Sequence, residues 1–291
     1  MQQTGNTTKG ITSIIFAGFF FALMTFFVRL SGDLPTMEKA FFRNAVAVLV
    51  SVVMLKKSSE GFHIRKTSLP SLFFRGFYGT IGLVCNFYAI DRMNISDANM
   101  LNKLSPFFAI IASYIILKEK ATVKEWITVV IAFTGALFII KPSFQLSSAY
   151  ALAGAVGGLG AGIAYTYVRK LGKMGERGPV IVMFFSIFSC LATLPGLIIS
   201  YKPMSPSQFG ILLLAGISAT GGQLCITRAY TFAPAKEISV FDYTQVIFAA
   251  LLGFFFLDQI PDIYSFAGYV IIIGCAVYKW MLGKQVTSQT P

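Results

Sequence analysis

The sequence contains one histidine, four cysteines and only 12 acidic residues among 291. His63 stands alone in a basic segment, and no apolar run holds an HExxH, GxSxG or CxxC pattern or a cluster of paired carboxylates. The chain therefore lacks a recognisable catalytic or metal-ligand set, and we expect no enzymatic activity, no cofactor and no metal. It also has no GK[ST] phosphate loop, which argues against ATP hydrolysis as its energy source.

Long charged stretches are also missing, since only 12% of the residues are charged while 55% are hydrophobic and the mean hydropathy is +0.71. One soluble core could not bury so many apolar side chains. They fall into runs long enough to cross a hydrocarbon core of about 30 Å at about 1.5 Å per helical residue. The predicted spans are residues 10–31, 37–55, 68–90, 96–117, 123–141, 149–170, 179–200, 207–231, 238–257 and 263–282. We therefore predict an all-α membrane protein of ten transmembrane helices in a lipid bilayer.

All four cysteines lie inside these runs, at Cys85, Cys190, Cys225 and Cys275. A thiol in such a setting behaves as a small apolar group, so we expect no disulfide. The first run begins near Ile11 and lacks a small-residue cleavage site before the second run, so we expect it to stay in the mature protein.

The net charge of +12 comes from basic residues in short segments between the runs, which does not suit a nucleic-acid-binding face. With a cytoplasmic N-terminus, the inner segments hold Lys9, Lys56, Lys57, Arg65, Lys66, Lys118, Lys120, Lys124, Arg169, Lys170, Lys173, Arg177, Lys236, Lys279 and Lys284. The outer segments hold only Arg29, Lys39, Arg92, Lys141 and Lys202. This bias predicts a multi-pass protein of the inner or plasma membrane with both termini in the cytoplasm and no nucleic-acid partner.

The second half of the sequence resembles the first after a shift of 140 residues. The matched residues are Arg29 with Arg169, Gly76 with Gly216, Gly82 with Gly222, Cys85 with Cys225 and Ala89 with Ala229. Five spans in each half is an odd number, so the two copies must have opposite orientations in the membrane. The expected domains are the five-helix repeats 1–141 and 149–284, followed by a short cytoplasmic tail, 285–291. Inverted repeats are typical of transporters.

The fourth run contains Leu104-Ser105-Pro106-Phe107-Phe108 and ends in Leu117-Lys118-Glu119-Lys120. With the five-plus-five repeat, this pattern resembles the EamA-type branch of the drug/metabolite transporter superfamily. The stretch from Arg75 through Asp97 to Lys141-Pro142-Ser143-Phe144 also resembles the solute-carrier 35 G-type branch. The second copy departs from the pattern, with Val246 at the proline position and Gln259 at the glutamate position. The resemblance implies a ten-helix transporter fold but no particular substrate.

Ionisable residues within the spans are costly and usually face a cavity or a partner. Lys103 lies near mid-membrane and shares a helix face with Asn99 and Pro106, where the proline predicts a helix kink. In the other repeat, Asp242 and Tyr243 take the positions that correspond to Asn102 and Lys103. We therefore expect Lys103 and Asp242 to face each other across a central cavity. Whether this pair takes part in transport or is only a structural salt bridge stays open.

Other polar residues complete the predicted substrate-binding set. Arg75 shares a helix face with Asn86 and could either reach the cavity or extend toward the headgroups. The full set is Arg43, Arg75, Asn86, Asn99, Lys103, Gln223, Ser239, Asp242 and Tyr243. Gly154, Gly158 and Gly162 form a small-residue stripe, which predicts close packing on a neighbouring helix or, as an alternative, a homodimer interface.

These features predict a secondary transporter or exporter that moves a small organic metabolite by alternating access. Away from the ends of the spans, the excess of basic over acidic residues favours an anionic, carboxylate-like substrate. The basic residues are Arg43, Arg75, Lys103 and Arg228, and the acidic residue is Asp242. An amino acid, or another zwitterionic or neutral metabolite or drug, is the alternative substrate class. A channel or a structural membrane subunit is the alternative from a different functional class.

Overall fold

The computed structural model describes residues 2–92, 101–140, 149–256 and 262–288, and all regular secondary structure in them is helical. The helices of the first half are α1 (Gln2–Leu30), α2 (Thr36–Lys56), η1 (Lys66–Ser68), α3 (Leu69–Arg92), α5 (Ser105–Leu117) and α6 (Val123–Ile140). Those of the second half are α7 (Ala149–Lys173), α8 (Gly178–Ser200), α9 (Pro206–Phe232), α10 (Ala235–Ile238), η2 (Ser239–Tyr243), α11 (Thr244–Phe256) and α12 (Ile263–Ser288).

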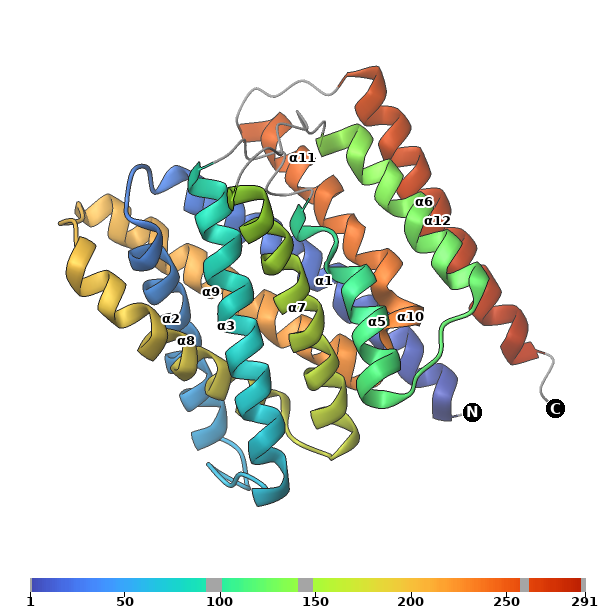
Figure 1. Cartoon of the computed structure of the whole chain (residues 1–291), viewed down its shortest axis with the longest axis horizontal. Helices are drawn as coiled ribbons and strands as arrows, with labels where there is room; N and C mark the ends of the chain where they lie inside the picture. Colours follow the sequence, from blue (N-terminus) through green and yellow to red (C-terminus); the bar gives the residue numbers. More distant parts are fainter. Residues whose placement is uncertain (1, 93–100, 141–148, 257–261, 289–291) are drawn as a thin grey trace.

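The helices agree with the ten predicted spans, and the prediction of a ten-helix protein built from two inverted five-helix repeats is confirmed. Among the described residues, five segments are long and apolar enough to cross a membrane by themselves, and α5 and residues 263–278 are shorter apolar helices. Figure 1 shows the helices as one bundle, with both chain ends on the same side of the molecule. We call that side the inner end, because the charge pattern predicts that it faces the cytoplasm.

The packing of the helices repeats when the two halves are exchanged, as an inverted repeat requires. Helix α1 packs along α9, and its counterpart α7 packs along α3. Helix α5 also lies against α7, while α11 lies against α1. The remaining counterparts pack on each other, α2 on α8 and α6 on α12, and the second of these pairs is visible at one side of Figure 1.

Large apolar side chains cover the outside of the bundle, and polar side chains are found within it. Phe255 and Val270 are 70% and 72% exposed, which suits contact with lipid tails. By contrast, the charged residues Arg43, Arg75 and Lys103 are buried. This arrangement places the costly polar groups at the contacts between the two repeats, away from the lipid-facing surface.

Glycines on α7 bring that helix unusually close to two helices of the first repeat. A Cβ atom at Gly160 would lie 2.8 Å from the backbone nitrogen of Gly82, which is in α3. A Cβ atom at Gly158 would lie 2.7 Å from the backbone oxygen of Leu101, and one at Gly162 would lie 2.7 Å from the nitrogen of Ala109. The predicted small-residue stripe therefore packs against its own chain, and the homodimer stays a prediction.

We predict that Gly158→Leu lowers the melting temperature or prevents folding, because its side chain would overlap the backbone at Leu101. Overpacking of this kind typically costs about 1–3 kcal/mol or more. Fluorescence-detected size-exclusion chromatography and thermal melting in detergent would measure the effect. Gly274→Leu is the matched control, since no atom lies within 4 Å of a Cβ atom there. Equal behaviour of the two variants would contradict the proposed close helix contact.

Candidate functional site

The fourth span is interrupted in the middle of the membrane. Residues 101 and 102 are helical, Lys103 and Leu104 form a turn, and α5 then begins at Ser105. Pro106 lies in the first turn of α5, where backbone N–H groups have no partner within the helix and proline is well tolerated. The sequence predicted a kink at Pro106, and the structure places a two-residue turn, Lys103 and Leu104, between helical residues just before it.

The ninth span is interrupted at the corresponding place in the second repeat. It consists of α10, the 3-10 helix η2 and α11, which begins at Thr244. The shift of 140 residues pairs Lys103 with Tyr243, so both breaks occupy the same position in their repeats. Val246 replaces the proline here, and the 3-10 segment provides the interruption instead. Discontinuous helices near the midplane form the binding sites of many transporters.

The two breaks contact each other through Lys103. Its Nζ atom lies 3.1 Å from Asp242 Oδ2 and donates hydrogen bonds to Gln245 Oε1 at 2.7 Å and to the backbone oxygen of Asp242 at 3.3 Å. The side chains of Lys103 and Asp242 are only 7% and 10% exposed. The pair expected from the repeat register is thus present, and the lysine charge is neutralised within the protein.

Tyr243 and Ser239 support this contact rather than offering their hydroxyl groups to a ligand. The Tyr243 hydroxyl donates to the backbone oxygen of Lys103 at 3.2 Å. Ser239 Oγ donates to the backbone oxygen of Ala235 at 2.5 Å. Both residues lie at the predicted site, but their polar groups are already engaged.

Arg75 on α3 points into the bundle and is only 2% exposed, so it does not extend toward the headgroups. Its Nη2 atom donates to Gln223 Oε1 at 3.0 Å, and its guanidinium carbon lies 4.0 Å from the centre of the Phe185 ring. Space for the guanidinium exists because Gly79, one turn further along, has no side chain. An amide and an aromatic face hold Arg75 in place without neutralising its charge, and its buried Nε has no partner.

Arg43 on α2 is 6% exposed and forms no hydrogen bond or ion pair with any other residue that the structure describes. The nearby acid on the same helix, Glu38, instead accepts a hydrogen bond from the backbone nitrogen of Lys202 at 3.1 Å. Within the described chain, therefore, neither Arg43 nor Arg75 has an acidic partner.

Two tyrosines connect the arginines with the Lys103–Asp242 pair. The rings of Tyr165 and Tyr230 are stacked, with centroids 4.9 Å apart. Tyr165 also lies within electrostatic range of Arg43, Arg75 and Asp242. The substrate-binding set predicted from the sequence includes none of Tyr165, Tyr230 and Phe185. These three are ordinary aromatic residues in apolar spans, and no spacing pattern marks them.

The other predicted residues take different places. Gln223 holds Arg75, as described above, while Asn86 is half-buried beside Gly157 and its Oδ1 has no hydrogen-bond partner. Asn99 lies outside the described residues. Arg228 is exposed, and its guanidinium carbon lies 5.5 Å from the centre of the Phe232 ring.

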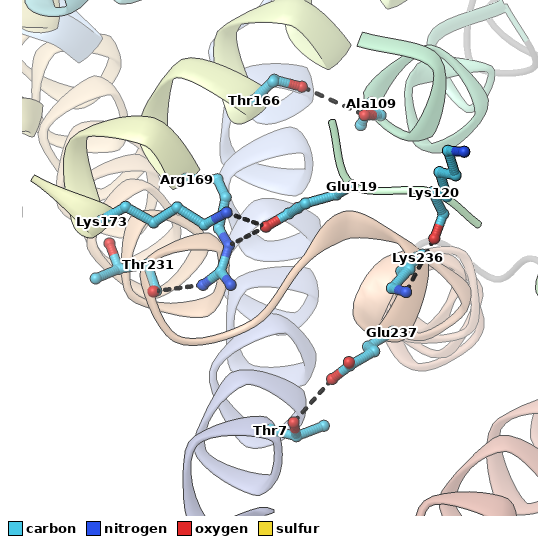
Figure 2. A network of polar contacts seen from close by, with 10 residues as sticks. All are labelled: Thr7, Ala109, Glu119, Lys120, Thr166, Arg169, Lys173, Thr231, Lys236 and Glu237. Carbon is cyan, nitrogen blue, oxygen red and sulfur yellow. Dashed lines mark hydrogen bonds and ion pairs between the residues drawn. The ribbon is translucent and has the colours of Figure 1, made fainter. Parts of the chain in front are cut away.

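A second polar cluster lies closer to the inner end, where α5, α7 and α9 terminate (Figure 2). Glu119 Oε1 lies 2.6 Å from Lys173 Nζ and 3.3 Å from Arg169 Nε, and Arg169 also donates to the backbone oxygen of Thr231 at 2.9 Å. The ion pairs join the end of α5 in the first repeat to the end of α7 in the second. They hold the two repeats together on the inner side of the site.

The chain matches the EamA-like transporter family over residues 8–141 and again over residues 148–278. It therefore belongs to the EamA-like transporter family. The double match follows the two repeats that the helix packing shows. The family places the chain among multi-pass membrane proteins that transport small molecules, and it points to a transporter rather than an enzyme.

Individual relatives agree with this assignment. The pseudopaline exporter CntI of Pseudomonas aeruginosa is 30% identical over 91% of this chain and 93% of its own length. The mouse solute carrier family 35 member G1 is 25% identical over 95% of this chain and 80% of its own length. A solved crystal structure superposes with a TM-score of 0.82 at 13% identity, covering 96% of this chain and 99% of that one, which supports the fold alone.

We predict that Asp242→Asn destabilises the protein because it leaves the Lys103 charge buried without a carboxylate. Removing one partner of a buried pair costs about 3–5 kcal/mol. Lys103→Met should also destabilise, and the double variant should lose clearly less than the two single losses combined. Thermal melting of the purified variants would measure this coupling. Strict additivity would show that the 3.1 Å contact contributes nothing to stability.

Proposed function

We propose that this protein is a secondary carrier that exports a small organic metabolite with a carboxylate-like anionic group by alternating access. The observation that carries the proposal is the pair of buried arginines, Arg43 and Arg75, that have no acidic partner among the described residues. A buried charge without a counter-charge is costly in the low-dielectric interior of a membrane protein. An anionic substrate would supply the missing counter-charge.

The chemistry of the arginines suits a carboxylate. The planar guanidinium group offers several donors in a fixed geometry that matches the two oxygen atoms of a carboxylate. The buried Nε atoms of Arg43 and Arg75 have no hydrogen-bond partner among the described residues. Tyr165 lies within electrostatic range of both arginines. Lys103 has the smaller role in this proposal, because Asp242 already neutralises it.

The positions of the two polar contacts between the repeats suggest how access would alternate. The Glu119 ion pairs close the inner side, so these contacts would have to separate before substrate could enter from the cytoplasm. The Lys103–Asp242 contact joins the two broken helices at the centre. Rocking of one repeat against the other would then expose the arginines to either side in turn.

The relatives and the charge pattern support the proposed direction of transport and the proposed location. The Pseudomonas relative is named as an exporter, which favours export over import. The excess of basic residues at one end of the bundle supports an inner or plasma membrane location with both termini in the cytoplasm.

A zwitterionic substrate such as an amino acid is the second candidate, and Asp242 is the observation that favours it. This carboxylate lies within electrostatic range of Tyr165, which also faces the arginines. A substrate ammonium group could therefore be held by Asp242 while its carboxylate is held by an arginine. Such a substrate would have to displace the Lys103 ammonium group from Asp242, whereas an anion would not.

We predict that a panel of carboxylates, amino acids, sugars and nucleotides will raise the melting temperature most strongly with carboxylates. The stabilising compound should then show saturable counterflow in proteoliposomes. Arg75→Gln should lower that counterflow at least about tenfold, the factor that corresponds to 1.4 kcal/mol, because a charged contact to the substrate is lost.

Arg228→Gln is the matched control and should keep wild-type counterflow, since Arg228 is exposed whereas Arg75 is buried. Flux that does not saturate would indicate a channel instead of a carrier. Stabilisation by sugars but by no carboxylate or amino acid would contradict the anion proposal. Wild-type counterflow in Arg75→Gln would contradict it as well.

A further inference from the structure

The buried site has a charge imbalance that can be counted. Among the described residues, four charged side chains lie in it. Arg43, Arg75 and Lys103 are positive and Asp242 is negative, so three positive charges and one negative charge leave a net charge of +2. Asp242 is committed to Lys103, at 3.1 Å. The two uncompensated charges are therefore those of the two arginines.

Two other described acidic residues, Glu38 and Glu119, do not correct this charge imbalance. Glu38 is buried on the helix of Arg43, but one of its oxygens binds the backbone nitrogen of Lys202, and it forms no ion pair with Arg43. Glu119 lies in the inner cluster and is bound to Arg169 and Lys173, as Figure 2 shows. Within the described part of the chain, the charge imbalance is thus not corrected by either of these acids.

The two guanidinium groups also act on each other. Arg43 lies close enough to Arg75 for their like charges to repel, and Tyr165 interacts with both. Like charges held together in a low-dielectric interior favour an ion of opposite sign between them. One negative charge would neutralise one guanidinium and leave the other uncompensated.

We infer that the substrate of this carrier is a dianion, with a dicarboxylate as the class that fits best, and this inference rests on the proposed function. One carboxylate is held by Arg43 and the other by Arg75, with the Tyr165 hydroxyl available as a further donor. Lys103 and Asp242 remain paired while the dianion is bound, so the occupied site is electrically neutral. A monoanion or a zwitterion would leave it positively charged.

The test compares compounds of the same shape and different charge. Dicarboxylates of three to six carbons are each compared with their half-amide and their diamide, which carry one negative charge and none. Affinities come from thermal stabilisation of the purified full-length protein at constant ionic strength. For the chain length that binds best, the dicarboxylate should bind at least about tenfold more tightly than the half-amide.

Arg43→Gln provides the sharper result, because it removes one of the two uncompensated charges. In this variant the preference for the dicarboxylate over the half-amide should fall at least about tenfold, while binding of the half-amide is largely kept. A merely structural role of Arg43 would weaken both ligands equally. Arg228→Gln, an arginine outside the site, should keep the wild-type preference.

The outcomes separate this inference from the function on which it rests. Equal binding of dicarboxylates and half-amides by the wild type would overturn the dianion inference and leave the anion carrier standing. An unchanged preference in Arg43→Gln would overturn the inference as well. Absence of stabilisation by every carboxylate, charged or half-blocked, would overturn the inference together with the proposed carboxylate site.

Discussion

The structure is governed by the cost of placing charge inside a membrane protein, where each buried ion needs a partner. Lys103 satisfies this requirement within the chain through Asp242 and Gln245. Arg43 and Arg75 do not, although both are as deeply buried. We interpret this difference as a division of roles. The Lys103–Asp242 pair joins the two repeats, and the two arginines are available to bind an anionic ligand.

Two features of the fold make this arrangement possible: two of the spans are interrupted, and glycines allow other helices to pack closely. The interruptions at Lys103 and at η2 bring polar side chains and backbone oxygens together where continuous helices would present only their faces. The glycine contacts of α7 with α3 and α5 bring the helix of Tyr165 close to the helix of Arg75. The ion pairs of Glu119 then hold the end of α5 and the end of α7 together at the inner side.

Much of this could be predicted from the sequence, because ten apolar runs and a constant register between the two halves carry long-range information. The register pairs Lys103 with Tyr243, the neighbour of Asp242, and on this basis Lys103 and Asp242 were expected to face each other. Pro106 marked the interruption of the fourth span. The partners of the arginines could not be predicted. Gln223 lies 148 positions from Arg75, and no pattern distinguishes Tyr165 or Tyr230 from other aromatic residues in the spans. The position of Arg75 along its helix also did not show whether its side chain points inward. The inward direction depends on the space left by Gly79, which has no side chain.

The most direct test of the central claim is the melting temperature of substrate-free Arg43→Met. If the Arg43 charge is uncompensated until an anion binds, an unbranched apolar side chain of similar shape should raise the melting temperature, while the stronger stabilisation by dicarboxylates than by their half-amides is lost. Arg228→Met, at an exposed position, should leave both measurements near those of the wild type. A clear fall in the melting temperature of substrate-free Arg43→Met would show that the protein itself already compensates this charge, and would contradict the account.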